Sequence, residues 1–313
     1  MKRLIGDGAT GRRGDGAMVL TQQLLGETFQ NPILLASGTC GFGRELAGVV
    51  DLEALGGLVT KAVTPECRDG NPPLRVAEFD AGMLNSVGLA NPGVDVFRAK
   101  YLPWLRDHLR HARVLVNVAG RTVDDYLRVV EAIDGETGFL GYELNVSCPN
   151  VKEGGAIFCS RPDLLAGVVG AVRAITKRPL AAKLAPNVPD IGHMAEVAVD
   201  AGADALTLIN TFPGLVFDLD TKRPVLGGGT GGVSGPALLP IGVYSVWQAA
   251  RRVKVPIMGV GGIRRGSDVV QYLLAGASLV QIGTASFADP RAAERVLAEL
   301  IRFMSARGVS EVR

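Results

Sequence analysis

The chain has 313 residues, of which 47% are hydrophobic and 20% are charged, so it is long and apolar enough to build a sizeable core. Its 33 basic and 31 acidic residues leave a net charge of +2, which argues against nucleic acid or an anionic membrane as the partner. No apolar run reaches the roughly 20 residues of a membrane-spanning helix, and the four cysteines form no C-x-x-C pair or zinc pattern, which favours free thiols in the reducing cytoplasm.

The first segment, residues 1–17, is rich in glycine and contains four basic residues, but it lacks the apolar stretch of a secretory signal. We expect a disordered tail here, followed by a single domain over residues 18–313. Two short runs, 19–24 and 27–30, flank Leu25-Gly26 and predict a β-hairpin ahead of the main fold.

Strand-like and helical patterns then alternate through the domain. The strand-like runs are continuous apolar stretches, as in a parallel sheet covered on both faces: 32–36, 57–63, 114–118, 141–146, 180–184, 205–209, 256–260 and 279–283. The helical patterns are 45–55, 94–111, 122–134, 162–176, 189–201, 240–253, 267–275 and 290–306. Eight strands that are each followed by a helix predict an α/β fold of the (β/α)₈ TIM-barrel type.

Two of the connections that leave strands are long, namely residues 64–93 and 210–239. Functional loops of this fold lie at the carboxyl ends of the strands. Long segments rich in glycine and proline at that end predict lids or substrate-binding loops.

A polar residue or a glycine lies at or near the end of every predicted strand. These residues are Ser37-Gly38, Lys61, Asn117, Asn145, Lys183, Asn210-Thr211, Gly261-Gly262 and Gly283-Thr284. Any one of them is compatible with an ordinary cap or turn. The two lysines are harder to explain in this way, because a lysine at such a depth requires an anionic partner. That partner is either a structural carboxylate or a ligand.

The last two strands end in glycine-containing turns, at residues 259–263 and 282–285. Barrels frequently bind phosphate after strands seven and eight, where backbone N–H groups face the anion. Glycine suits this role because a side chain would hold the phosphate away from the backbone. The residues alone therefore predict a barrel that holds a phosphorylated cofactor.

Residues 141–150 read as a short buried strand that opens into a polar turn, and Pro149 is expected to stop the strand pairing. The turn contains Cys148. Taken alone, this cysteine is compatible with a small buried thiol as well as with a reactive group.

These motifs together resemble the catalytic subunit of class 1 dihydroorotate dehydrogenases, the FMN barrels of pyrimidine synthesis, from about residue 31 to residue 290. The resemblance rests on Asn31-Pro32, Ala36-Ser37-Gly38, Lys61, Asn71-Pro72-Pro73, the run from Asn85 to Gly93, the run from Asn145 to Asn150, Asn210-Thr211 and residues 259–263. Residues 151–155 are more similar to class 1B, although Phe158-Cys159-Ser160 departs from the expected Phe-Gly.

The resemblance implies which residues contact which ligand. FMN contacts would come from Ser37, Lys61, Ala62, Asn117, Asn145, Lys183, Ile209, Gly235, Gly261, Gly262, Gly283 and Thr284. Substrate contacts would come from Lys61, Asn85, Ser86, Val87, Gly88, Leu89, Asn145, Asn210 and Thr211. Cys148 would be the general base, and residues 154–160 would form a lid.

Class 1B also implies a partner for the chain. A homodimer would join an electron-transfer subunit that carries FAD and a [2Fe-2S] cluster, in a heterotetramer that reduces NAD⁺. No cluster belongs to this chain, whose cysteines lack the spacing for one. The alternatives are a class 1A enzyme that reduces fumarate without a partner, an RNA-modifying barrel resembling dihydrouridine synthases, and a barrel that binds flavin or pyrimidine without chemistry.

Overall fold

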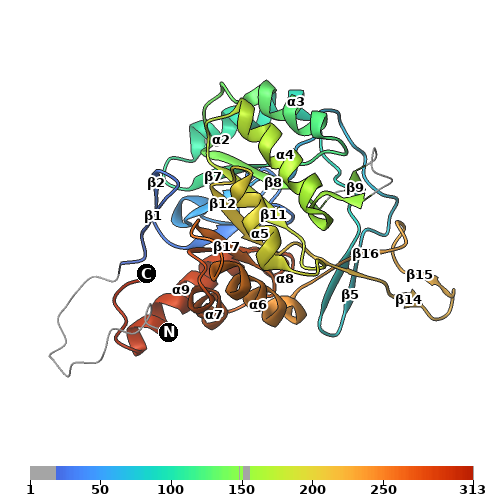
Figure 1. Ribbon diagram of the computed structural model, residues 1–313. Coiled ribbons are helices and arrows are strands. Elements are labelled where there is room, and N and C mark those ends of the chain that lie inside the picture. The colour runs from blue at the N-terminus through green and yellow to red at the C-terminus, as the bar shows by residue number, and fades with distance from the viewer. Residues whose placement is uncertain (1–18, 148, 151–155, 313) are drawn as a thin grey trace.

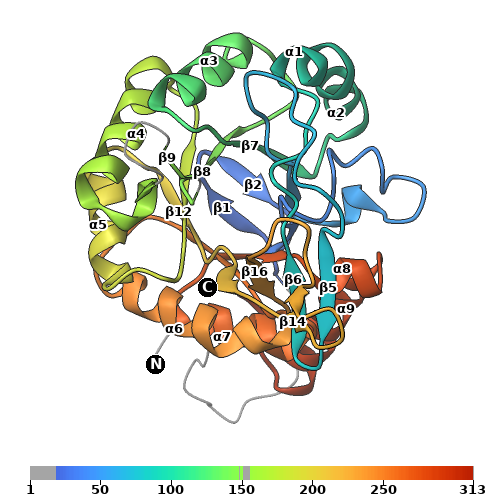
Figure 2. The same ribbon diagram turned by 90° about the vertical axis from the view of Figure 1, so that its right-hand side faces the viewer.

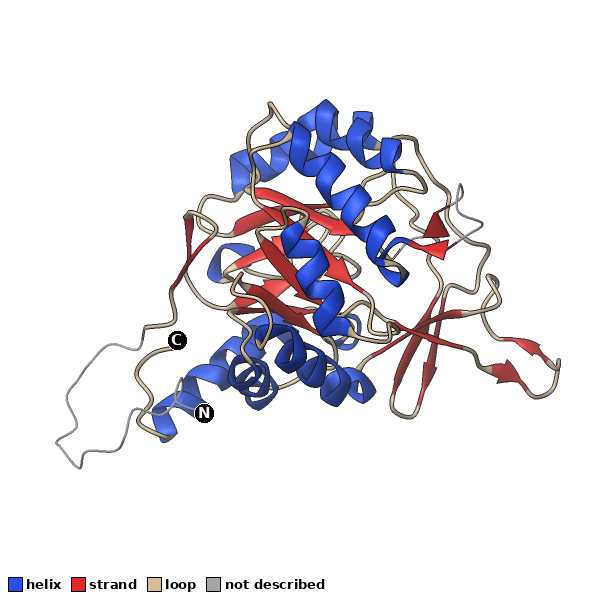
Figure 3. Ribbon diagram, in the orientation of Figure 1, coloured by secondary structure: helices blue, strands red, loops and turns tan. Residues whose placement is uncertain are grey.

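The structure is a computed structural model that describes residues 19–147, 149–150 and 156–312. Its centre is a closed barrel of eight strands in the order β11-β12-β17-β18-β3-β4-β7-β8, and all neighbouring pairs are parallel. The strands are β3 (Ile33–Leu35), β4 (Gly57–Val59), β7 (Arg113–Val118), β8 (Gly141–Asn145), β11 (Leu180–Leu184), β12 (Ala205–Leu208), β17 (Ile257–Val260) and β18 (Leu279–Ile282). The predicted barrel is confirmed (Figures 1 and 3).

Helices form a layer outside the barrel, as Figure 2 shows for α3 to α7. The long helices are α3 (Val123–Ile133), α4 (Pro162–Ile175), α5 (Ile191–Asp200), α6 (Leu239–Ala250), α7 (Gly266–Ala275) and α9 (Ala292–Ala306). Capping side chains mark the first turns of two of these helices. Thr122 and Asp125 form a capping box at α3, and Asp190 accepts a hydrogen bond from the His193 amide at α5.

The helix predicted over residues 45–55 is wrong. The segment forms turns and one short 3₁₀ helix, η1 (Leu52–Ala54). Gly48 and the β-branched pair Val49 and Val50 disfavour a helix. The Asp51 side chain then accepts a hydrogen bond from the Ala54 amide and starts a separate turn.

The helix predicted over residues 94–111 is present in three pieces. They are α1 (Val94–Val96), the π-helical turn η2 (Phe97–Tyr101) and α2 (Leu102–His108). Pro103 lies just inside α2, where it has no N–H to donate and where its ring would collide with the carbonyl group four residues earlier. A π turn before the proline removes this conflict.

The barrel interior has an apolar layer at its amino end and a polar layer above it. The hairpin β1 (Gln22–Leu24) and β2 (Glu27–Phe29), which confirms the predicted hairpin, contributes the fully buried Phe29 to the apolar layer. Its other members are Leu34, Val59, Leu115, Ala181, Ala205, Met258 and Leu279. Side chains of a strand alternate between its faces, so the next inward positions lie two residues further along. Four of these positions hold buried polar or charged residues, namely Asn117, Lys183, Thr207 and Gln281.

The two long connections are not simple loops, because they pair with each other. They build a four-stranded antiparallel sheet in the order β13-β16-β6-β5. Its strands are β5 (Val76–Phe79), β6 (Gly82–Asn85), β13 (Phe212–Gly214) and β16 (Gly231–Ser234). A small hairpin, β14 (Phe217–Asp218) and β15 (Arg223–Pro224), projects beyond this sheet (Figure 1). The sheet forms a wall at the carboxyl end of the barrel.

Strand pairing resumes after β8, contrary to the expectation for Pro149. The pair β9 (Pro149–Asn150) and β10 (Ala156–Ile157) is antiparallel and leads into η4 (Phe158–Ser160). A two-stranded ribbon consists of edges only, where a missing proline N–H is tolerated. Cys148, residues 151–155 and the predicted tail lie outside the described residues, and so do the first two positions of the predicted lid, residues 154 and 155.

Two further helices are short, namely η5 (Pro236–Leu238) and α8 (Ala285–Ala288). None of the helices in the described part of the chain has the length and apolar character that crossing a bilayer requires.

Candidate active site

A cavity of about 1060 Å³ lies at the carboxyl ends of the barrel strands, beneath the added sheet. Ligand sites commonly measure about 300–1,000 Å³, so this one has room for a cofactor and a small second molecule. Apart from Cys148, which the structure does not describe, every predicted site residue lines it: Ser37, Lys61, Ala62, Asn85, Ser86, Val87, Gly88, Leu89, Asn117, Asn145, Lys183, Ile209, Asn210, Thr211, Gly235, Gly261, Gly262, Gly283 and Thr284.

The two lysines of the cavity differ in their partners. Lys183 Nζ lies 3.5 Å from Glu143 Oε1 and donates a hydrogen bond to Ser37 Oγ at 3.2 Å. Lys183 therefore has a structural counterion and still faces the cavity. The Lys61 side chain has no hydrogen-bond or ion-pair partner among the residues that the structure describes, so its charge is left for an anionic occupant.

Glu143 is a residue that the sequence reasoning missed. It is fully buried, and its carboxylate accepts hydrogen bonds from Asn117 Nδ2 at 2.7 Å, Thr207 Oγ1 at 2.8 Å and Gln281 Nε2 at 2.8 Å. The signal was present in the sequence, because a glutamate inside an apolar strand must find donors or a cation. The identity of those donors depends on strands that are distant in the sequence.

Asn117 offers the cavity an acceptor. Its Nδ2 group is engaged by Glu143, whereas its Oδ1 atom is buried and has no hydrogen-bond partner among the described residues. A buried amide oxygen without a donor is costly. An occupant that presents an N–H group here would satisfy it, and a flavin ring has such a group.

Glycines form the part of the cavity wall that follows β17. Gly261 and Gly262 follow β17 with φ of +119° and +77°, a region that favours glycine. A Cβ atom on Gly262 would lie 2.3 Å from the Leu239 backbone nitrogen, where α6 begins. The Tyr272 hydroxyl donates to the Gly261 carbonyl at 2.7 Å and holds the turn. These contacts explain why glycine occupies this turn, which lines the cavity where the phosphate group is predicted.

Three asparagines from different connections reach the same cavity. Asn210 Nδ2 donates to Asn145 Oδ1 at 3.2 Å, and Asn85 Nδ2 donates to the Gly232 carbonyl at 3.0 Å. The Tyr126 hydroxyl donates to the Asn145 backbone carbonyl at 2.7 Å and fixes the end of β8. Amide side chains supply both donors and acceptors, which suits a planar substrate with ring amides.

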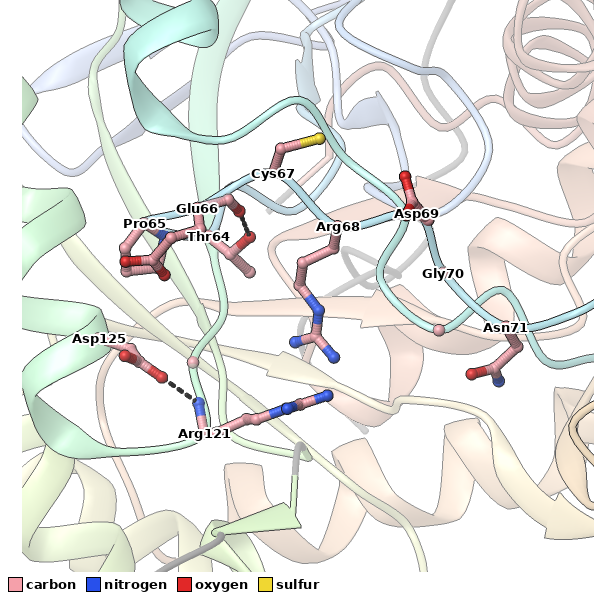
Figure 4. A pocket seen from close by; sticks show the side chains of 12 residues that line it. Thr64, Pro65, Glu66, Cys67, Arg68, Asp69, Gly70, Asn71, Arg121 and Asp125 are labelled. Carbon is pink, nitrogen blue, oxygen red and sulfur yellow. Dashed lines mark hydrogen bonds between the residues drawn. The ribbon is translucent and has the colours of Figure 1, made fainter.

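A second hollow of about 440 Å³ adjoins the cavity, and Arg68, Asn71 and Gly88 line both. Figure 4 shows the guanidinium groups of Arg68 and Arg121 directed toward each other across it. The Arg121 backbone amide is held by Asp125 Oδ2 at 2.7 Å. Glu66, Asp69 and Asp125 also line this hollow, so charges of both signs meet beside the cavity.

Comparisons with known proteins agree with this geometry. The chain is 46% identical over 294 residues to the dihydroorotate dehydrogenase B (NAD⁺) catalytic subunit of Geobacter sulfurreducens, which covers 94% of this chain and 96% of the relative. It is 49% identical over 290 residues to a putative dihydroorotate dehydrogenase A (fumarate) of Solibacter usitatus, covering 93% and 95% of the two chains.

A crystal structure of DHODH from Eimeria tenella in complex with ferulenol superposes with a TM-score of 0.79 at 25% identity, covering 94% of this chain and 86% of that one. A family model described as dihydroorotate dehydrogenase matches residues 19–304. Because that match spans nearly the whole barrel and its cavity, the chain belongs to the dihydroorotate dehydrogenase family.

Proposed function

We propose that this chain is the catalytic subunit of an NAD⁺-linked, class 1B dihydroorotate dehydrogenase, and that it oxidises dihydroorotate to orotate in pyrimidine biosynthesis. The observation that supports this most strongly is the single cavity in which two lysines, three asparagines and the glycine turns meet. Relatives named as NAD⁺-linked catalytic subunits, at 44–46% identity over most of the chain, support the same assignment.

The cofactor we assign is one FMN per chain. Gly261, Gly262, Gly283 and Thr284 would hold its phosphate, and the unpaired Asn117 Oδ1 would accept a hydrogen bond from its ring. The rest of the flavin site would be lined by Ser37, Lys61, Ala62, Asn145, Lys183, Ile209 and Gly235. When bound, the flavin supplies the two-electron acceptor that amino-acid side chains lack.

The residues of the chain would bind the substrate and take its proton. Lys61, which has no internal counterion in the described structure, would meet the substrate carboxylate. Asn85, Asn145 and Asn210 would orient the ring amides, and the segment from Ser86 to Leu89 with Thr211 would complete the substrate site.

Oxidation removes a proton from one ring carbon and a hydride from its neighbour. Cys148, which follows the end of β8, would take the proton as a thiolate and become a thiol. The lid around residues 154–160 would exclude water while this happens.

The electrons would leave through a second subunit. We propose a cytoplasmic homodimer of this chain, joined by electron-transfer subunits that carry FAD and a [2Fe-2S] cluster, as a heterotetramer that reduces NAD⁺. The proposed partner is supported by the NAD⁺-linked relatives, which are named as catalytic subunits. We propose that this domain spans residues 18–313.

A class 1A enzyme is a second candidate, because a relative of similar identity is named as a putative fumarate-dependent enzyme. Such an enzyme passes its electrons to fumarate and needs no partner subunit.

Purification of the chain from its source organism distinguishes the two candidates. For class 1B, a second subunit with FAD and an iron–sulfur spectrum should purify with it, and NAD⁺ reduction should depend on that subunit. Fast fumarate reduction by the isolated chain, with no second subunit, would instead establish class 1A. Failure of dihydroorotate to bleach the bound flavin under anaerobic conditions would refute both.

A further inference from the structure

The floor of the cavity is formed by a buried polar network around one carboxylate. Four groups face Glu143: the amides of Asn117 and Gln281, the hydroxyl of Thr207 and the ammonium group of Lys183. They come from β7, β18, β12 and β11, so five of the eight barrel strands converge on this point. Glu143 is 0% exposed and Lys183 is 6% exposed.

Three of these neighbours, Asn117, Thr207 and Gln281, donate hydrogen bonds to the carboxylate, and the ammonium group of Lys183 forms an ion pair with it at 3.5 Å. Lys183 is the only cation within 4 Å of this carboxylate among the residues that the structure describes. The two charges therefore form a nearly neutral pair in a region of low dielectric. Glu143 does not line the cavity, whereas Lys183 does.

Lys183 and Glu143 have different positions relative to the cavity. Lys183 lines the cavity, and its ammonium group is held by a hydrogen bond to Ser37 and an ion pair with Glu143. Because Glu143 lies behind the ammonium group, its negative charge opposes the field that Lys183 exerts on an occupant. The electric field at the cavity floor is then the sum of the contributions of two opposite charges, which partly cancel.

We propose that Glu143 is a positioning residue that sets the reduction potential of the bound flavin through Lys183. The inference rests on the proposed flavin site. Glu143 lowers the potential by offsetting Lys183, since the extra electron density of a reduced flavin would be more strongly stabilised by an uncompensated ammonium group.

The test is the midpoint potential of the flavin in the purified holoenzyme, measured by anaerobic titration against reference dyes. Glu143→Gln keeps the size of the side chain and removes the charge. We expect the equilibrium constant for flavin reduction to rise at least about tenfold, which is about 30 mV upward for a two-electron couple. Lys183→Gln should shift the potential downward by a comparable factor, and the double variant should return toward the wild-type value.

The opposite signs are the diagnostic result, because general loosening of the site would move both single variants in the same direction. Thr207→Val is the matched control. It removes a hydrogen bond to the same carboxylate without changing charge, so it should shift the equilibrium constant less than about threefold. Glu143→Asp, which retains the charge, should lie closer to wild type than Glu143→Gln does.

Two results would overturn the proposal: no upward shift in Glu143→Gln, or shifts of the same sign in Glu143→Gln and Lys183→Gln. If Glu143→Gln does not retain flavin, the ion pair is tested by thermal unfolding of the flavin-free single and double variants. Removing both charges leaves no unpaired buried ion, so the double variant should be more stable than either single variant. A double variant that is less stable than both would refute the pairing. Wild-type protein that fails to bind flavin would instead refute the proposed function.

Discussion

Replacement of Gly262 by alanine is expected to damage the turn after β17. The residue has φ of +77°, where an L-residue costs about 1–2 kcal/mol. The added Cβ atom would also lie 2.3 Å from the Leu239 nitrogen and 2.6 Å from its Cα, and such overpacking typically costs about 1–3 kcal/mol. Because both close atoms belong to the backbone at the start of α6, rotation of a side chain cannot relieve the overlap.

The expected total is therefore about 2–5 kcal/mol of unfolding free energy. We expect the midpoint of thermal unfolding to fall by roughly 4–20 °C, since 1 kcal/mol shifts it by about 2–4 °C in chains of 150–250 residues. The assay is thermal unfolding of the flavin-free protein, followed by circular dichroism. A Gly262→Ala protein as stable as wild type would refute the reasoning about this turn.

Gly283→Ala is the matched comparison on the neighbouring strand. Its Cβ atom would meet only Ala36 Cβ, at an ordinary 3.6 Å, so the flavin-free protein should keep its stability within about 1 kcal/mol. The new methyl group would nevertheless enter the proposed phosphate site, so FMN affinity should fall at least about tenfold, or 1.4 kcal/mol, in a fluorescence titration. Unchanged affinity would place the phosphate elsewhere.

Three further predictions concern the cavity and the thiols. Cys148→Ala should keep FMN bound but reduce turnover by about two to four orders of magnitude, as loss of a general base does; turnover near wild type would exclude Cys148 as the base. Lys61→Ala should weaken flavin retention and raise the KM for dihydroorotate, since one cation would serve both ligands; a fully flavinated protein with unchanged KM would contradict this. Burial raises the pKa of the Cys40 thiol to about 12 and also raises the pKa of Cys159, whereas Cys67 is exposed. A thiol reagent at pH 8 should therefore modify Cys67 in the native Cys148→Ala protein, and Cys40 and Cys159 only after unfolding. Rapid native modification of Cys40 would refute this account of its burial.

The barrel was predictable because its pattern is local and repeated. Continuous apolar runs of strand length, each followed by a helical pattern, identify a parallel sheet covered on both faces. The same count placed Ser37, Asn117 and Thr284 at one end of the barrel, since the carboxyl ends of parallel strands share one edge. The strand-end positions could therefore be brought together from the sequence, whereas Gly235 and the run from Asn85 to Leu89 were assigned only through the family resemblance.

Other features depend on contacts that one segment cannot reveal. The helix predicted over residues 45–55 failed because capping by Asp51 and weak local propensity outweigh a helical spacing of apolar residues. The long connections were predicted as loops, yet β6 and β16 pair across about 150 residues of sequence. Backbone groups at that separation carry no local signature of their partner.

The sequence by itself determined the barrel, the edge at which the chemistry lies and the residue types available there, because these follow from apolar periodicity and from which residues end each strand. Only the tertiary structure decided how the charges are distributed. It pairs Lys183 with Glu143 and leaves Lys61 without a partner among the described residues. The physical reason is that a buried charge is stabilised by its neighbours in space, and the neighbours of Glu143 come from four other strands.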